Sequence, residues 1–185
     1  MGFAICARVI LQGLAKGYPL RGAVEVGVAT DVFRHEVYGP ALIEASRIEQ
    51  EEAHSMRVVI GRGLRGLLNE AVAPPVAGVV PVMEQHFARR AMSMLVTDTD
   101  DALALDFLGQ TVRAGIDERM FIEAATQAHR VLMSAKQLWR DDNPRIADKY
   151  RSALAYFATR GHMTLSGEWT PHLLRDDKPW FAAPR

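Results

Sequence analysis

Three neighbouring stretches decide the fold: GYPLRGAVEVG at residues 17–27, EVYGPALIEASRIE at 36–49 and RVVI at 57–60. The first alternates apolar and polar residues and predicts a strand over residues 20–28, although two glycines lie inside it. In the second, Gly39 and Pro40 open a helix that we expect to run to about Ala53, since proline is tolerated in a first helical turn. The third predicts a short buried strand over residues 56–60.

The flanking segments predict further helices and strands. Apolar residues recur at helical spacing over residues 3–16, and the same pattern predicts a short helix at 64–72 and long amphipathic helices at 116–139 and 145–159. Residues 30–37 are typical of a polar turn or a hairpin arm, and residues 76–83 of an edge strand at best, because Gly78 and Pro81 interrupt them. The domain is expected to span residues 1–160 and to be followed by a tail over 161–185.

An acidic turn is expected between two apolar runs, 91–96 and 102–108. The turn sequence Asp98-Thr99-Asp100-Asp101 predicts a hairpin with a solvated tip. Calcium binding is the less favoured alternative, because an EF-hand loop starting at Asp98 would need Gly and Glu where Leu103 and Gly109 stand.

Composition limits the classes of function. The chain has 185 residues, 49% of them apolar, with 22 basic and 22 acidic side chains and a net charge of zero. Without an overall positive charge, no role in coating nucleic acid is expected. Cys6 is the only cysteine, which excludes a disulfide within the chain and a cysteine-rich zinc site, and is typical of a cytoplasmic protein. The sequence contains no run of about 18 uncharged apolar residues, so no membrane span is predicted.

A glycine-rich loop offers one alternative function. Residues 61–66, GRGLRG, follow a predicted strand and open a predicted helix, as in a dinucleotide-binding fingerprint, and Glu84 follows at a distance suited to a ribose-binding acid. However, Pro74 and Pro75 cut the helix short, and Pro81 would interrupt the next strand. A Rossmann-like nucleotide-binding domain is therefore the third-ranked interpretation.

The three quoted stretches resemble the second half of the class III adenylate and guanylate cyclase domain. In that family an acid-x-aromatic-Gly segment leads into a helix that ends in Ala-Ser-Arg-hydrophobic-Glu, as residues 36–39 and 45–49 do here. The chain is also similar to a bacterial branch that includes the antiphage pyrimidine cyclases, on Gly-x-Pro-Leu-Arg-Gly at 17–22 and Gly-Pro-Ala-Leu at 39–42. The resemblance runs from about Ile5 to Thr159. It implies an α+β fold with a partial ferredoxin-like antiparallel sheet, helices packed on one face, and long C-terminal helices.

The resemblance also implies two site residues. Arg47 matches the catalytic arginine that stabilises charge on the reacting phosphate, a task suited to a permanently charged, planar group. Glu36 matches the acid that reads the base in purine cyclases, whereas Ile43 stands where those enzymes carry asparagine. An ion pair of Arg47 with Glu44 or Glu51 on the helix surface is the alternative role for that arginine.

The family converts a nucleoside triphosphate to a cyclic nucleotide and pyrophosphate with Mg²⁺ or Mn²⁺, in a head-to-tail dimer. Its two metal-binding aspartates belong to the first half of the domain, which would precede Met1, so no metal ligand is found in this chain. We therefore expect a cyclase-like cytoplasmic protein that is inactive as given and that binds a triphosphate and a second chain, as a homodimer or through another partner over an open sheet edge. A non-catalytic remnant that binds nucleotides or a partner is the alternative.

Overall fold

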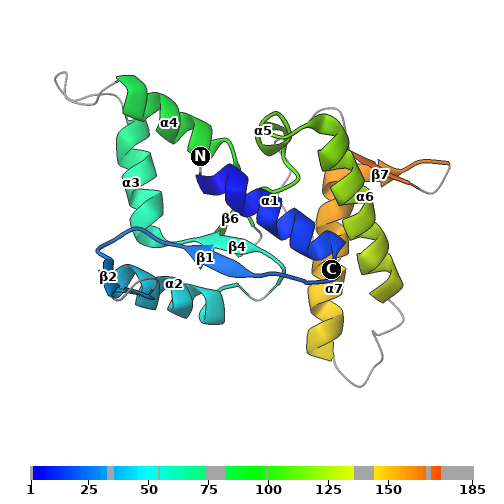
Figure 1. Cartoon of the computed structure of the whole chain (residues 1–185), viewed down its shortest axis with the longest axis horizontal. Coiled ribbons are helices and arrows are strands. Elements are labelled where there is room, and N and C mark those ends of the chain that lie inside the picture. The colour runs from blue at the N-terminus through cyan, green and yellow to red at the C-terminus, as the bar shows by residue number, and fades with distance from the viewer. Residues whose placement is uncertain are drawn as a thin grey trace.

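The computed structural model describes residues 2–32, 36–53, 55–73, 82–98, 100–135, 144–165 and 168–171. The helices are α1 (Gly2–Ala15), α2 (Pro40–Glu51), α3 (Arg62–Val72), α4 (Val82–Met92), α5 (Gln110–Arg113), α6 (Glu118–Ser134) and α7 (Pro144–Arg160). The strands are β1 (Gly22–Val24), β2 (Thr30–Val32), β3 (Glu36–Tyr38), β4 (Val58–Ile60), β5 (Leu95–Thr97), β6 (Leu103–Leu105), β7 (Gly161–Met163) and β8 (Trp169–Pro171). The α+β class expected from the sequence is confirmed (Figure 1).

The central sheet has the strand order β1-β4-β6-β5 and is mixed, with one parallel pair of strands where an antiparallel sheet was expected. β1 pairs in parallel with β4, Gly22 opposite Val58, because α2 returns the chain to the start of the sheet before β4 begins. β6 pairs antiparallel with both β4 and β5. The ferredoxin-like fold contains a split β-α-β unit, in which the two parallel strands are not neighbours. Here the two parallel strands, β1 and β4, are hydrogen-bonded directly to each other.

Helices cover both faces of the sheet, not one as expected. Alternation along β4 places Val59 with Ile48 of α2 in a small cluster, while Val58 joins the main core on the other face. β1 alternates in the same way, with Ala23 on the α2 side and Val24 on the other. Because both faces are covered, all of β4 is buried.

The main core is formed by α1, α6 and α7 against the sheet. The apolar stripe that predicted the first helix is buried, and its members are Ala7, Ile10, Leu11 and Leu14. They meet the buried face of α6, and Phe157 of α7 is completely buried beside them. Of the predicted segment 116–139, residues 118–134 are helical, and residues 136–139 lie outside the described residues.

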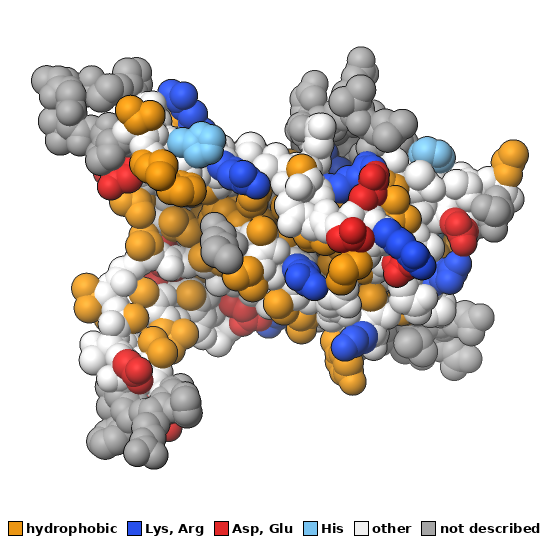
Figure 2. Space-filling model, turned by 45° about the horizontal axis from the view of Figure 1, so that its top comes forward, with side chains coloured by type: hydrophobic (Ala, Val, Ile, Leu, Met, Phe, Trp, Pro, Cys, Tyr) orange, Lys and Arg blue, Asp and Glu red, His pale blue; other side chains and the backbone are white. Residues whose placement is uncertain are grey.

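Two arms extend from this body on the same side (Figure 1). One is the pair α3 and α4; the other is the hairpin of β2 and β3. Part of the edge strand expected at 76–83 lies outside the described residues, and its end, Val82 and Met83, is the first turn of α4. Figure 2 shows the surface hollowed between the arms, with hydrophobic side chains on both flanks.

The segment expected to be a tail begins as a hairpin that packs on the core. β7 and β8 pair antiparallel, and the Trp169 indole is 2% exposed beside Phe157, whose carbonyl oxygen accepts a 3.1 Å hydrogen bond from Trp169 Nε1. Gly161 leaves room for this ring, since a Cβ there would lie 2.3 Å from it. Residues 172–185 lie outside the described part of the chain.

Among the described helices, none combines the length and the apolar character that crossing a membrane requires.

Candidate functional site

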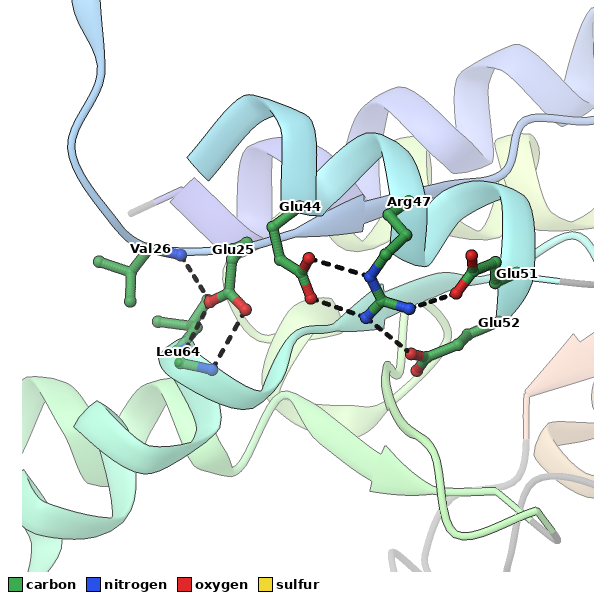
Figure 3. Close-up of polar contacts among 8 residues, drawn as sticks. Glu25, Val26, Glu44, Arg47, Glu51, Glu52 and Leu64 are labelled. Atoms are coloured by element: carbon green, nitrogen blue, oxygen red, sulfur yellow. Dashed lines mark hydrogen bonds and ion pairs between the residues drawn. The ribbon is translucent and has the colours of Figure 1, made fainter. Parts of the chain in front are cut away.

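Arg47 lies on the outer face of α2, held by carboxylates of its own helix. Its Nε and one terminal nitrogen donate to the two oxygens of Glu44 at 2.9 and 2.7 Å, and the other terminal nitrogen pairs with Glu51 (Figure 3). Glu52 lies 3.5 Å from the guanidinium. The side chain is 40% exposed, so the surface position expected for Arg47 is observed.

The ion pairs fix both the charge and the orientation of this guanidinium. The hydrogen bond from Arg47 lowers the pKa of Glu44, and the bonds to Glu44 and then Glu51 raise the pKa of Arg47. One positive charge among three carboxylates leaves the group negative overall. The ion-pair alternative named from the sequence is therefore present, and contact with a phosphate stays a prediction.

Glu25, at the end of β1, occupies the N-terminus of α3. One carboxylate oxygen accepts hydrogen bonds from the backbone N–H groups of Leu64 and Val26, both at 2.7 Å, and the other accepts from Gly63 at 3.1 Å (Figure 3). A helix N-terminus attracts negative charge because its first N–H groups lack partners within the helix. Here the chain's own carboxylate fills the position that a pyrophosphate would take in the dinucleotide-binding interpretation.

The glycines of the 61–66 loop make room for Glu25. A Cβ on Gly61 would lie 2.3 Å from one carboxylate oxygen, and a Cβ on Gly63 would lie 2.8 Å from the other. The signal in the sequence that suggested phosphate binding thus has a structural cause within the chain. The glycine pattern marks the loop in the sequence, but nothing in the sequence links it to Glu25, which lies 38 residues before Gly63.

Glu36 lies on β3 at the other end of α2 from Arg47. It is exposed, and its carboxylate accepts a 3.3 Å hydrogen bond from the Tyr38 hydroxyl. The helix rises about 1.5 Å per residue, so the seven residues from Pro40 to Arg47 span about 10 Å. The structure therefore does not bring the two predicted site residues into contact.

The acidic turn between β5 and β6 is only partly solvated, which corrects the expectation. The side chain of Asp98 is 3% exposed and forms an ion pair with Arg57, which directly precedes β4. The guanidinium of Arg57 also donates a 2.6 Å hydrogen bond to the carboxylate of Asp100. Burial alone would lower the pKa of Arg57, but Asp100 and Asp98 raise it. Asp98 and Asp100 are thus engaged by an arginine, which ties the hairpin to the central strand.

A second buried polar network joins β6 to α7. The Tyr156 hydroxyl donates to Asp106 at 2.7 Å and accepts from the Leu108 N–H at 2.8 Å, while Arg160 pairs with Asp106 at 2.6 Å. Burial, followed by the negative charge of Asp106, raises the pKa of Tyr156 well above its usual range. The network fixes the end of the sheet to the long helix.

No described residues fit the two metal ions that the cyclase resemblance implies. Within the described ranges, no three side chains of histidine, cysteine, aspartate or glutamate are placed to hold a metal ion. No family model matches the chain, and no curated protein or solved structure matches it either.

Proposed function

We propose that the protein is a cyclase-like, non-catalytic protein that self-associates through an apolar surface at one end of its sheet. One observation carries this proposal: six large apolar side chains between residues 26 and 43 are exposed to solvent. They form what we call the apolar face, and its members are Val26, Val28, Val37, Tyr38, Leu42 and Ile43.

Backbone contacts bring the segments that carry these residues together. The loop after β1 lies against the start of α2 so closely that a Cβ on Gly39 would lie only 2.4 Å from the Val28 carbonyl oxygen. Gly39 also has a positive φ of 151°, which glycine adopts readily. Val28 is 73% exposed and Ile43 71%. Contiguous exposed apolar surface of this kind marks interaction sites in soluble proteins.

The sheet supports the same conclusion, because β1 is the first strand in the order β1-β4-β6-β5 and has no strand on its outer side in the described part of the chain. An open strand edge offers unpaired backbone groups, which proteins usually cover. The occupant that we propose is a second copy of this chain, in accord with the dimer that the cyclase resemblance implies.

Light scattering of purified protein tests this proposal. Leu42→Lys with Ile43→Lys places two charges on the apolar face and should convert a dimer into a monomer. Leu165→Lys is the matched control, since Leu165 is a fully exposed leucine outside the face. A wild-type protein that is monomeric at high concentration would contradict the proposal, as would equal dissociation of the control.

Absence of catalysis is tested separately. We expect no cyclic nucleotide when the 185-residue chain is incubated with each of the four triphosphates and Mn²⁺, because the resemblance covers only the half that carries Glu36 and Arg47. Product formation well above a protein-free blank would show that the chain is an enzyme.

Triphosphate binding at Arg47 is the second candidate function, supported by its surface position and by the cyclase resemblance; it would require the phosphate to displace Glu44 and Glu51 from the guanidinium. Arg47→Ala should then weaken triphosphate binding in calorimetry. Arg119→Ala is the control, because Arg119 is also a surface arginine paired within its helix, with Glu123 at 2.8 Å. Equal affinity in the two variants would remove the reason for a site at Arg47.

A further inference from the structure

A cavity between α4 and α5 carries basic and polar side chains that the proposed function does not use. Its volume is about 510 Å³ and it is open to solvent. This volume lies within the range of about 300–1,000 Å³ found for small-ligand sites, but the cavity is shallow and would leave much of a ligand exposed. Six of its lining residues carry polar or charged groups, although the surface that faces the cavity is mostly apolar: His86, Arg89, Arg90, Ser93, Gln110 and Thr111.

The wall contributed by α4 is a basic helix face. His86, Arg89, Arg90 and Ser93 are spaced by three, four and seven residues, so they share one side of the helix. Figure 2 shows a histidine and basic side chains together on the surface over α4, beside exposed hydrophobic side chains. This face therefore places two arginines and a histidine beside the cavity.

Arg89 and Arg90 have no carboxylate partner among the described residues. Most arginines of the described chain form ion pairs, including Arg113 on the neighbouring α5, which pairs with Glu118. No ion pair involves Arg89 or Arg90 within the described ranges, and both are exposed in the last turn of α4. Two adjacent guanidinium groups repel each other, and an anion bound between them would relieve this repulsion.

The two walls of the cavity are held at a fixed separation. The backbone N–H of Asp106 donates a 2.8 Å hydrogen bond to the carbonyl oxygen of Met94, which follows α4. The N–H of Gly109, which precedes α5, donates a 3.0 Å hydrogen bond to the backbone carbonyl oxygen of Asp106. The carboxylate of Asp106 is in turn held by Tyr156 and Arg160. A site built on such a support needs little reorganisation to bind a ligand.

We propose that the α4–α5 cavity binds a small phosphate-bearing molecule of nucleotide size. Arg89 and Arg90 would contact the phosphate, because guanidinium groups match the geometry of phosphate oxygens. The hydroxyl of Thr111 and the amide of Gln110 on the opposite wall can donate to and accept from the hydroxyl groups or the base of the ligand. The site is separate from Arg47 and does not depend on self-association.

Calorimetry with pyrophosphate and with ADP tests this site. Arg89→Ala with Arg90→Ala should weaken binding of both probes about tenfold or more, since two charge-assisted contacts are lost. Arg8→Ala with Arg65→Ala is the matched control, because it removes two charges from exposed arginines on α1 and α3. The control and Arg47→Ala should both bind as the wild type does, which separates this site from the one considered at Arg47.

A second variant guards against misfolding of the first. Ala114→Glu places a carboxylate on the exposed α5 wall and leaves both arginines in place, so it should also weaken binding of both probes. Equal loss of affinity in the Arg8/Arg65 control, or unchanged affinity in Ala114→Glu, would overturn the proposal. So would selective binding of a single-stranded oligonucleotide without binding of ADP or pyrophosphate, which would make the face a nucleic-acid surface.

Discussion

Replacing Glu25 with alanine removes the acceptor for three backbone N–H groups at once. Two of them, from Gly63 and Leu64, belong to the first turn of α3 and have no other partner within that helix. The third, from Val26, follows β1. The substitution therefore releases the start of α3 from the edge of the sheet.

The size of the effect follows from the kind of contact. Loss of a side chain that caps a helix N-terminus costs about 0.5–2 kcal/mol, and the attraction of a carboxylate to the helix dipole contributes about 0.3–1 kcal/mol. Because Glu25 is only half-buried, we expect the free energy of unfolding to fall by about 1–2 kcal/mol. For a chain of this length that corresponds to a fall in Tm of about 2–8 °C.

Urea denaturation followed by circular dichroism measures this change. Glu70→Ala is the control, since it removes an exposed carboxylate from the same helix that accepts none of the observed hydrogen bonds. The control should unfold at the urea concentration of the wild type. If Glu25→Ala and Glu70→Ala behaved alike, the capping role assigned to Glu25 would be wrong.

A double-mutant cycle with Gly63→Ala sharpens the test. In the wild type the new methyl group would lie 2.8 Å from a Glu25 oxygen and displace it. In the Glu25→Ala background nothing opposes the methyl group, and the higher helix propensity of alanine should stabilise α3 by about 0.5–1 kcal/mol. Additive effects of the two substitutions would refute the explanation given for this glycine.

Three further substitutions test the buried polar and aromatic contacts. Tyr156→Phe should lower the free energy of unfolding by about 2–4 kcal/mol, because the buried Leu108 N–H and the Asp106 carboxylate each lose a hydrogen bond; Tyr18→Phe, at an exposed tyrosine, is the control in the same denaturation assay. Trp169→Ala should cost about 3–5 kcal/mol, since it empties a core site, and a loss below about 1 kcal/mol would show that the β7–β8 hairpin does not pack on the core. Burial lowers the pKa of His129 from 6.5, so the unfolded state binds the proton first and stability is lost as the pH falls below 6.5 towards the lowered value. His129→Leu should therefore reduce the difference in stability between about pH 7.5 and about pH 5.5, and an unchanged difference would contradict this assignment.

The sequence alone determined the local elements wherever one face of a segment is buried. α1, α6 and α7 lie close to their expected positions because their buried residues recur at helical spacing, as Ala7, Ile10 and Leu14 do. α2 was predicted from the Gly39-Pro40 pair that opens it. The hairpin of β5 and β6 was likewise predictable from its acidic turn. α4 was not predicted: its first residues, Val82 and Met83, were assigned to an edge strand over 76–83, and Ala88 is its only fully buried residue.

Only the tertiary structure decided which distant groups meet. Glu25 caps a helix 38 residues further along the chain, Arg57 binds Asp98 across 41 residues, and Trp169 completes a core formed by earlier helices. The parallel pairing of β1 with β4 and the basic cavity between α4 and α5 arise in the same way. Periodicity records which side of a segment is buried, whereas the choice of partner depends on how the packed helices and strands bring chain segments together, and no local pattern contains that information.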